Sequence, residues 1–294
     1  AGMDILGQGL TAEIGSQSFR GLPFSISADP TKCFIFLNKD SGSVEIPVRK
    51  PAYHIIFAHR LLRSDIDDGG PVGSLIANYS FDMEGKQRVE YPIRERFEIA
   101  SVPMDSFRGP SGLPFRAVSD GKHELLPRNE GKWHEFGRRQ TEYLQATAKN
   151  YFLWAWANPN PDKNIESIRI IPKGPGFVIS AITLSHLDEY PFARQGRREV
   201  KFTLTDSPAE ATEFDLQVKI DRGDSTYPFG LSEDPDVGFI KALHRGFGER
   251  HNENPNSSYA EISAIPSATV SLEQNGKTIG QIPWGRIENE GKVE

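Results

Sequence analysis

The densest group of potential metal-binding side chains lies in the segment His244–Glu253. Its imidazole nitrogens and carboxylate oxygens are the ligand types that Zn²⁺ and other transition metals prefer. They come from His244, Glu249, His251 and Glu253. Their spacing matches no zinc signature, because there is no helical His-Glu-x-x-His and two glycines interrupt any helix. We interpret the segment as a solvated or docking loop, and the alternative is a metal-dependent hydrolase or lyase that uses these four residues.

A second group of carboxylates lies in the segment Ser64–Gly70, which contains Asp65, Asp67 and Asp68. Aspartates at alternate positions ahead of glycine can surround Ca²⁺, a cation that takes six or more oxygen ligands. The segment lacks the remaining ligands of an EF-hand loop. Solvated loop aspartates are therefore our main interpretation, and a structural calcium ion is the alternative. No other cofactor is predicted.

Other catalytic signatures are absent from the sequence. It contains no Gly-x-Ser-x-Gly, no Gly-x-x-x-x-Gly-Lys-[Ser/Thr] and no Gly-x-Gly-x-x-Gly. Cys33 is the single cysteine, so no internal disulfide is possible, and its apolar neighbours predict a small buried side chain. Paired carboxylates for glycoside hydrolysis are set by the fold rather than by spacing, so the sequence selects no such pair.

Charge and hydropathy argue against two further classes of function, nucleic-acid binding and membrane spanning. The net charge of −6 argues against nucleic acid as a partner, because neutralising phosphates requires clustered Lys and Arg. No apolar run approaches the roughly 20 residues of a membrane span. No signal peptide is visible in the sequence.

The elements that must position these side chains are mainly strands. Tyr151–Ala157 is apolar on both faces, and alternation places Phe152, Trp154 and Trp156 on one of them. That aromatic stripe is typical of a sandwich core, with sugar stacking as the alternative. Strands over Ile165–Ile171 and Phe177–Leu184 follow, and we expect the three to form a meander against a second sheet.

Further strands are expected on either side of this stretch. In Tyr53–Leu62, His54 and His59 have opposite parity and point to opposite faces as hydrogen-bonded sheet histidines. Leu75–Met83 and Arg88–Arg94 predict a hairpin, which Glu95–Ile99 continues with its charges toward solvent. Residues 100–135 form a long excursion that is rich in Pro, Gly and charge, and such excursions often carry a binding surface.

A domain boundary is expected near Gly196, which separates residues 1–195 from 196–294. The second part contains strand patterns, and Asn275-Gly276 between the last two is a strong hairpin signal. We also predict one short helix over Ser232–His244, with acids near its start and basic groups near its end. The strand patterns are Glu199–Leu204, Phe214–Ile220, Tyr259–Ala264, Ala268–Glu273 and Lys277–Trp284.

Several segments of the first part occur in a recognisable order: Phe19–Phe24, Ser43–Pro47, Phe57-Ala-His59, Asn78–Phe81, Tyr91–Ile93, Trp154–Lys163 and Ile165–Ile168. Together they resemble galactose-binding-like β-sandwich domains, which accompany bacterial secreted hydrolases. The second part is similar to the region ahead of the catalytic domain in carbaryl-hydrolase-like metallohydrolases of the PHP superfamily. That similarity involves Phe247–Glu253, Pro266–Val270 and Trp284-Gly285.

The resemblance implies an all-β accessory region, with a jelly-roll sandwich followed by a smaller β-rich domain with one short helix. It also implies a secreted or periplasmic location. In such sandwiches the ligand usually sits in loops at one end, often beside a structural calcium. That implication points to Asp65, Asp67 and Asp68, or to the long loop with Trp133 and His134. No catalytic residue carries over.

Three functional hypotheses follow. The first is a non-catalytic module that binds carbohydrate or docks to a larger secreted hydrolase. The second is the metal-dependent enzyme that uses the segment His244–Glu253. The third is a structural subunit of a surface layer or filament.

Overall fold

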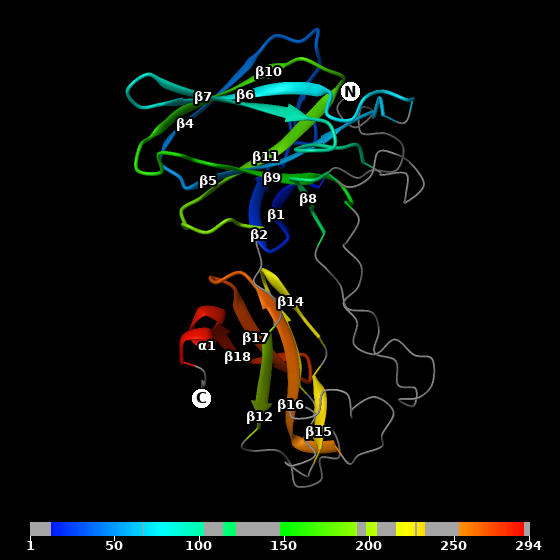
Figure 1. The fold of residues 1–294 in the computed structure, drawn as a ribbon, viewed down its shortest axis with the longest axis vertical. Helices are drawn as coiled ribbons and strands as arrows, with labels where there is room; N and C mark the ends of the chain where they lie inside the picture. The colour runs from blue at the N-terminus through cyan, green and yellow to red at the C-terminus, as the bar shows by residue number, and fades with distance from the viewer. Residues whose placement is uncertain are drawn as a thin grey trace. The chain divides into compact units, whose positions relative to one another are not determined.

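The computed structural model describes residues 13–66, 68–102, 114–121, 148–192, 198–204, 216–226, 228–232 and 253–290. The chain divides into two compact units, of which the first ends at Phe192 and the second contains Ala193–Glu294. Both are built from antiparallel strands, and α1 (Trp284–Glu290) is the one helix within the described ranges (Figure 1). The protein is therefore all-β, as the strand patterns predicted.

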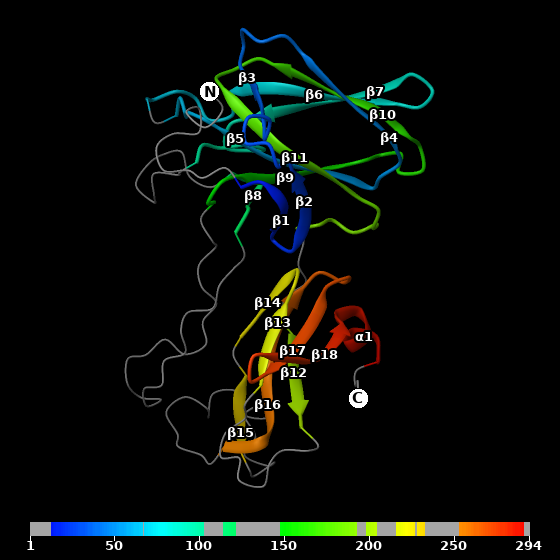
Figure 2. The same cartoon turned by 180° about the vertical axis from the view of Figure 1, so that it is seen from behind.

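The first unit is a β-sandwich of two facing sheets (Figures 1 and 2). One sheet has the order β4 (Val44–Lys50), β10 (Ile165–Pro172), β6 (Leu75–Met83) and β7 (Gln87–Arg94). The other has the order β3 (Ile35–Leu37), β11 (Phe177–Ser185), β5 (His54–Leu61), β9 (Phe152–Ala157) and β8 (Val118–Ser119). A separate hairpin joins β1 (Gly15–Phe19) to β2 (Leu22–Ile26).

Aromatic side chains from both sheets fill the space between them. Phe81 of β6 stacks on Trp156 of β9, with ring centroids 3.7 Å apart, and Phe57 stacks on Trp154 at 5.6 Å. Trp154 and Trp156 are only 2% and 3% exposed, so the predicted aromatic stripe is sandwich core and is not open to a ligand. Burying such a side chain contributes about 1.5–3 kcal/mol.

The opposite face of the five-stranded sheet is also covered. Leu153 and Ala155 of β9 pack there with Phe19 and Phe24 from the β1–β2 hairpin. Cys33 lies in the same cluster, 3% exposed, as its sequence context predicted. Alternation along β9 thus predicted correctly which side chains share each face, and why both are apolar.

The predicted meander is wrong in its pairing. β9, β10 and β11 form where expected, but β9 pairs with β5, β10 with β4 and β6, and β11 with β3 and β5. Facing sheets lie about 10 Å apart, and the residues between β9 and β10 are numerous enough to span that gap. These three strands therefore alternate between the two sheets, and each buries an apolar face between them. Such alternation is expected of a jelly-roll sandwich.

The second unit contains two smaller sheets around its own core. One consists of β12 (Arg198–Thr203), β16 (Glu253–Ala264), β14 (Gly223–Ser225) and β15 (Phe229–Ser232). The other consists of β13 (Gln217–Ile220), β17 (Thr269–Gln274) and β18 (Lys277–Pro283). Their core includes Phe202, Ile262, Val270 and Trp284.

The hairpin predicted at Asn275-Gly276 joins β17 to β18, with both turn residues at positive φ. The helix predicted over Ser232–His244 lies outside the described residues, apart from Ser232, which ends β15. The observed helix begins instead at Trp284, which sequence analysis assigned to a strand. The side chain of Trp284 is buried in the core, and its backbone N–H donates to the Ala268 carbonyl (2.8 Å). Within the described ranges, no helix has the length and hydropathy needed to cross a membrane.

Candidate functional site

A tight turn follows β7 in the first unit. The backbone N–H groups of Phe97 and Glu98 both donate to the Arg94 carbonyl (3.1 Å each), and that of Arg96 donates to Ile99 (2.8 Å). Arg96 has a φ of 66°, which is uncommon for a residue with a side chain and costs roughly 1–2 kcal/mol. The turn brings two arginines, a phenylalanine and a glutamate close together.

The glutamate at this turn is fully buried and ionically compensated. The carboxylate of Glu98 accepts hydrogen bonds from the backbone N–H (3.0 Å), Nε (3.2 Å) and Nη2 (2.9 Å) of Arg94. The hydrogen bond to Glu98 raises the pKa of Arg94. Sequence analysis predicted that the charges of Glu95–Ile99 face solvent, which is wrong for Glu95 and Glu98. Both are buried, because partners inside the protein replace water for their carboxylates.

Cations and aromatic rings alternate beside this ion pair. The Arg94 guanidinium lies 4.4 Å from the Phe97 ring centroid, and Arg96 lies 5.3 Å from that of Phe115. The Phe97 and Phe115 rings meet edge to face, 5.2 Å apart. Such contacts are each worth about 0.5–1.5 kcal/mol. Phe115 is nevertheless 65% exposed, so one ring of this stack is held in place while open to solvent.

The segment that carries Phe115 is fixed to the turn by its backbone. The backbone N–H of Phe115 donates to the Arg96 carbonyl (2.9 Å), and that of Arg116 donates to the Phe97 carbonyl (2.8 Å). The Arg116 guanidinium donates through Nη1 to the hydroxyl of Tyr91. We call the group the arginine–aromatic cluster; its members are Tyr91, Arg94, Arg96, Phe97, Glu98, Phe115 and Arg116.

The cluster is anchored to the sandwich core. The Tyr91 ring lies 4.9 Å from that of Trp154. His59, fully buried, uses Nε2 to donate to the Glu98 carbonyl (2.9 Å), so its Nδ1 accepts from the Tyr79 hydroxyl (2.9 Å). Burial lowers the pKa of His59 to about 4, which keeps the ring neutral at pH 7. His59 thus acts as the hydrogen-bonded sheet histidine that its parity predicted.

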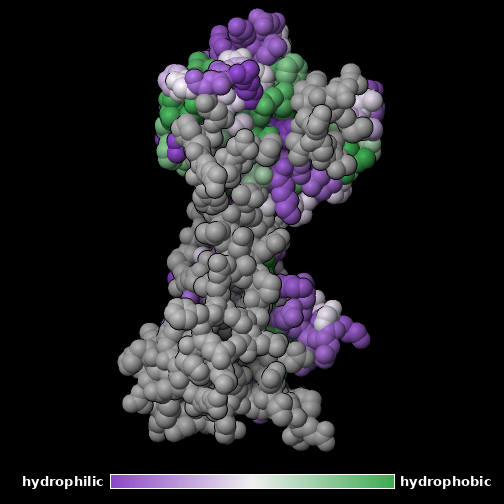
Figure 3. All heavy atoms as spheres, turned by 90° about the vertical axis from the view of Figure 1, so that its right-hand side faces the viewer, coloured by the Kyte–Doolittle hydropathy of each residue, from purple (hydrophilic) through white to green (hydrophobic). Residues whose placement is uncertain are grey.

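A second loop, which includes Ser64 and Gly73, adjoins the cluster through Glu95. The Ser64 hydroxyl donates to the Glu95 carboxylate (2.5 Å), and the Gly73 N–H donates to the Glu95 carbonyl (3.2 Å). Gly73 has a φ of 90°, and a Cβ there would lie 3.4 Å from the Phe97 ring. Val72 in this loop and Leu75 at the start of β6 are 48% and 42% exposed. Figure 3 shows hydrophobic and hydrophilic residues side by side on the described surface of the first unit.

The segment predicted to bind calcium belongs to this adjoining loop. The main-chain oxygen of Asp65 accepts from the N–H groups of Asp68 (3.2 Å) and Gly70 (2.8 Å), and the Asp68 carboxylate pairs with Arg63. Asp67 lies outside the described residues. No group of three metal-binding side chains occurs in the described ranges. The calcium site stays a prediction.

The other predicted site residues lie mostly outside the described part of the chain. These are Trp133, His134, His244, Glu249 and His251. Glu253 begins β16, where its backbone pairs with Ser232. Metal binding by the segment His244–Glu253 and ligand binding by Trp133 and His134 therefore stay predictions.

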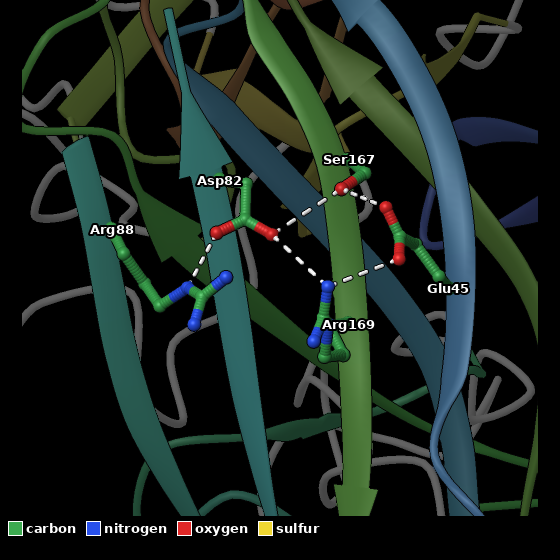
Figure 4. A network of polar contacts seen from close by, with 5 residues as sticks. All are labelled: Glu45, Asp82, Arg88, Ser167 and Arg169. Carbon is green, nitrogen blue, oxygen red and sulfur yellow. Dashed lines mark hydrogen bonds and ion pairs between the residues drawn. The ribbon is translucent and has the colours of Figure 1, made fainter. Parts of the chain in front are cut away.

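A separate polar network crosses the four-stranded sheet, and Figure 4 shows its five members on neighbouring strands: Glu45, Asp82, Arg88, Ser167 and Arg169. Ser167 lies between the two carboxylates, 2.9 Å from Glu45 and 3.5 Å from Asp82. Arg169 pairs with Glu45 (3.1 Å) and Arg88 with Asp82 (2.5 Å). Each carboxylate of the network is therefore held by an arginine. The network links neighbouring strands of the sheet.

Sequence reasoning missed the arginine–aromatic cluster. The sequence contains the run Arg94-Glu-Arg-Phe-Glu98 and the pair Phe115-Arg116, but no pattern in it indicates that these two segments are in contact. Phe115 does lie in the excursion over residues 100–135, for which a binding surface was expected. Comparison with known protein families, curated proteins and solved structures finds no match to this chain.

Proposed function

We propose that the first unit is a non-catalytic module that binds carbohydrate through the arginine–aromatic cluster. The observation that carries this proposal is the 65% exposed ring of Phe115, held between Phe97 and Arg96. Aromatic faces stack on sugar rings, and guanidinium N–H groups donate to ring and hydroxyl oxygens. A ring that is already immobilised loses little entropy when a ligand binds.

Three acidic groups in and near the cluster and in the sheet network are held by partners, which supports a binding role rather than catalysis by them. Glu98 is saturated by Arg94, Glu95 accepts from Ser64, and Asp82 is paired with Arg88. Acid–base catalysis requires a carboxyl group within reach of the substrate and able to exchange a proton. We include an accessory role beside a larger secreted hydrolase, and a secreted or periplasmic location, in the proposal.

The test uses the full chain. A glycan microarray that covers neutral and acidic polysaccharides selects ligands, and isothermal titration calorimetry measures their affinity. We expect Phe115→Ala to weaken binding by about tenfold or more, because the stacking platform is removed. Phe36→Ala is the matched control, since Phe36 is also partly exposed (38%) but lies on β3, outside the cluster. Absence of binding to every glycan on the microarray, or equal affinity of Phe115→Ala and wild type, would contradict the proposal.

A further inference from the structure

Arg116 shares its counter-ion, Glu98, with Arg94. The Glu98 carboxylate already accepts three hydrogen bonds from Arg94. The Nε of Arg116 lies 4.0 Å from the same carboxylate, which is beyond hydrogen-bonding distance. Among the described residues, the Arg116 guanidinium makes one hydrogen bond, through Nη1 to the Tyr91 hydroxyl. Because its side chain is 56% exposed, the remaining N–H donors are open to a ligand.

An arginine in this state is suited to an anionic group. The planar guanidinium binds carboxylate and sulfate oxygens through paired, charge-assisted hydrogen bonds. Anchoring by Tyr91 reduces the entropy that the side chain loses on binding. The chain as a whole carries a net charge of −6, so this local positive charge is not a general property of the surface. Recognition of a neutral sugar would not require it.

We propose that the ligand is an acidic polysaccharide. Its sugar ring stacks on Phe115, and its carboxylate or sulfate group binds the guanidinium of Arg116. The inference rests on the proposed carbohydrate-binding function and adds the chemical class of the sugar. Nucleic acid is the less favoured polyanion, because a phosphate backbone requires several clustered cations and this chain is acidic.

The experiment compares four probes by isothermal titration calorimetry with the full chain. They are polygalacturonate, which carries carboxylates; a sulfated galactan; a neutral galactan; and a single-stranded DNA oligonucleotide. We expect one of the two acidic polysaccharides to bind at least about tenfold more tightly than neutral galactan, as one charge-assisted contact allows. The carboxylated and sulfated probes identify which anionic group is recognised.

Variants at Arg116 assign the preference to that residue. We expect Arg116→Gln to remove the preference for the acidic polysaccharide while leaving the stacking contribution of Phe115. Arg116→Lys retains the charge without the planar fork and should restore part of the preference. Arg88→Gln is the control, because Arg88 is similarly exposed (49%) but belongs to the network on the sheet. Circular dichroism and urea unfolding establish that each variant is folded.

The outcomes separate this inference from the proposed function. Binding of neutral and acidic galactans with equal affinity, lost in Phe115→Ala, would overturn the acidic ligand and leave the carbohydrate function intact. DNA that binds as tightly as the acidic polysaccharide would reduce the result to general polyanion attraction and overturn the inference. An acidic preference that persists in Arg116→Gln would also overturn it. Absence of binding to every probe and every glycan on the microarray would remove the proposed function itself.

Discussion

His59 illustrates how burial decides the chemistry of a single side chain. Imidazole is a common metal ligand and general base, yet this ring is fully enclosed, between the Tyr79 hydroxyl and the Glu98 carbonyl. Strand alternation predicted that His54 and His59 point to opposite faces, and this is confirmed: His54 lies beside Tyr190, and His59 faces the sandwich core. The partners of His59 come from a different strand and a turn, so the sequence could not identify them.

The buried His59 predicts a pH-dependent loss of stability. Its pKa is lowered from 6.5 to about 4 in the folded state, so the unfolded chain takes up the proton first as pH falls. The contribution of His59 is therefore complete above pH 6.5 and is lost as pH falls toward 4, by up to about 3 kcal/mol. Urea unfolding at about pH 7 and pH 4.5 measures the change.

The variant His59→Gln separates this residue from the carboxylates that also titrate in acid. A glutamine amide can accept from Tyr79 and donate to Glu98, but it does not ionise. We expect the variant to be less stable than wild type at neutral pH and to lose less stability on acidification. An identical pH dependence for both proteins would exclude His59 as the source.

At the scale of elements, sequence patterns predicted where strands form better than how they pair. Apolar alternation identified β9, β10 and β11 because side-chain period depends on local backbone geometry alone. Pairing depends on which strand crosses the sandwich, and that is set by packing over long sequence separations. The cluster was missed for the same reason: its contacts join the turn after β7 to residues 114–116, and neither segment has a periodic pattern.

We expect substitution of Asp120, which lies at the entry to β9, to lower the stability of the protein strongly. Its carboxylate accepts from the backbone N–H groups of Lys149 (2.8 Å), Asn150 (2.8 Å) and Tyr151 (3.0 Å), and it is 5% exposed. Asp120→Asn replaces one acceptor oxygen by a donor and leaves at least one of the three N–H groups without its acceptor. We expect a loss of about 2–3 kcal/mol in the free energy of unfolding, measured in urea.

The matched control for Asp120 is Asp40→Asn. Asp40 is exposed, and no hydrogen bond to its carboxylate occurs within the described residues. We expect it to change stability by less than about 0.5 kcal/mol. Equal effects of the two substitutions would show that the three hydrogen bonds do not hold β9 in place.

In the β17–β18 turn, we expect a side chain at Gly276 to lower stability through backbone strain alone. Gly276 has a φ of 73°, and an added Cβ would meet nothing within 4 Å. Gly276→Ala should therefore destabilise the second unit by roughly 1–2 kcal/mol through backbone strain alone. Gly280→Ala is the control within β18, because a Cβ there meets only Leu272 at 4.0 Å and its φ lies outside the positive region. Thermal unfolding that ranks the two variants equally would contradict this account.

At the scale of the whole molecule, each unit has a core of its own. The first unit buries a core of aromatic and aliphatic side chains between its sheets, and the second buries a smaller set around Ile262 and Trp284. Sequence composition placed a boundary after residue 195, and the compact units divide after Phe192. A compact unit with its own core can unfold as a cooperative unit.

Two core substitutions test this separation. Phe81 is fully buried and stacked on Trp156, so Phe81→Ala should destabilise the first unit by about 3–5 kcal/mol. Ile262 is fully buried in the second unit, and Ile262→Ala should cost it about 2–5 kcal/mol. Calorimetry of the full chain should then resolve two transitions, each variant lowering the temperature of one and leaving the other in place. A single transition that both variants lower together would mean that the two cores share one cooperative unit, and that a ligand bound to the first also stabilises the second.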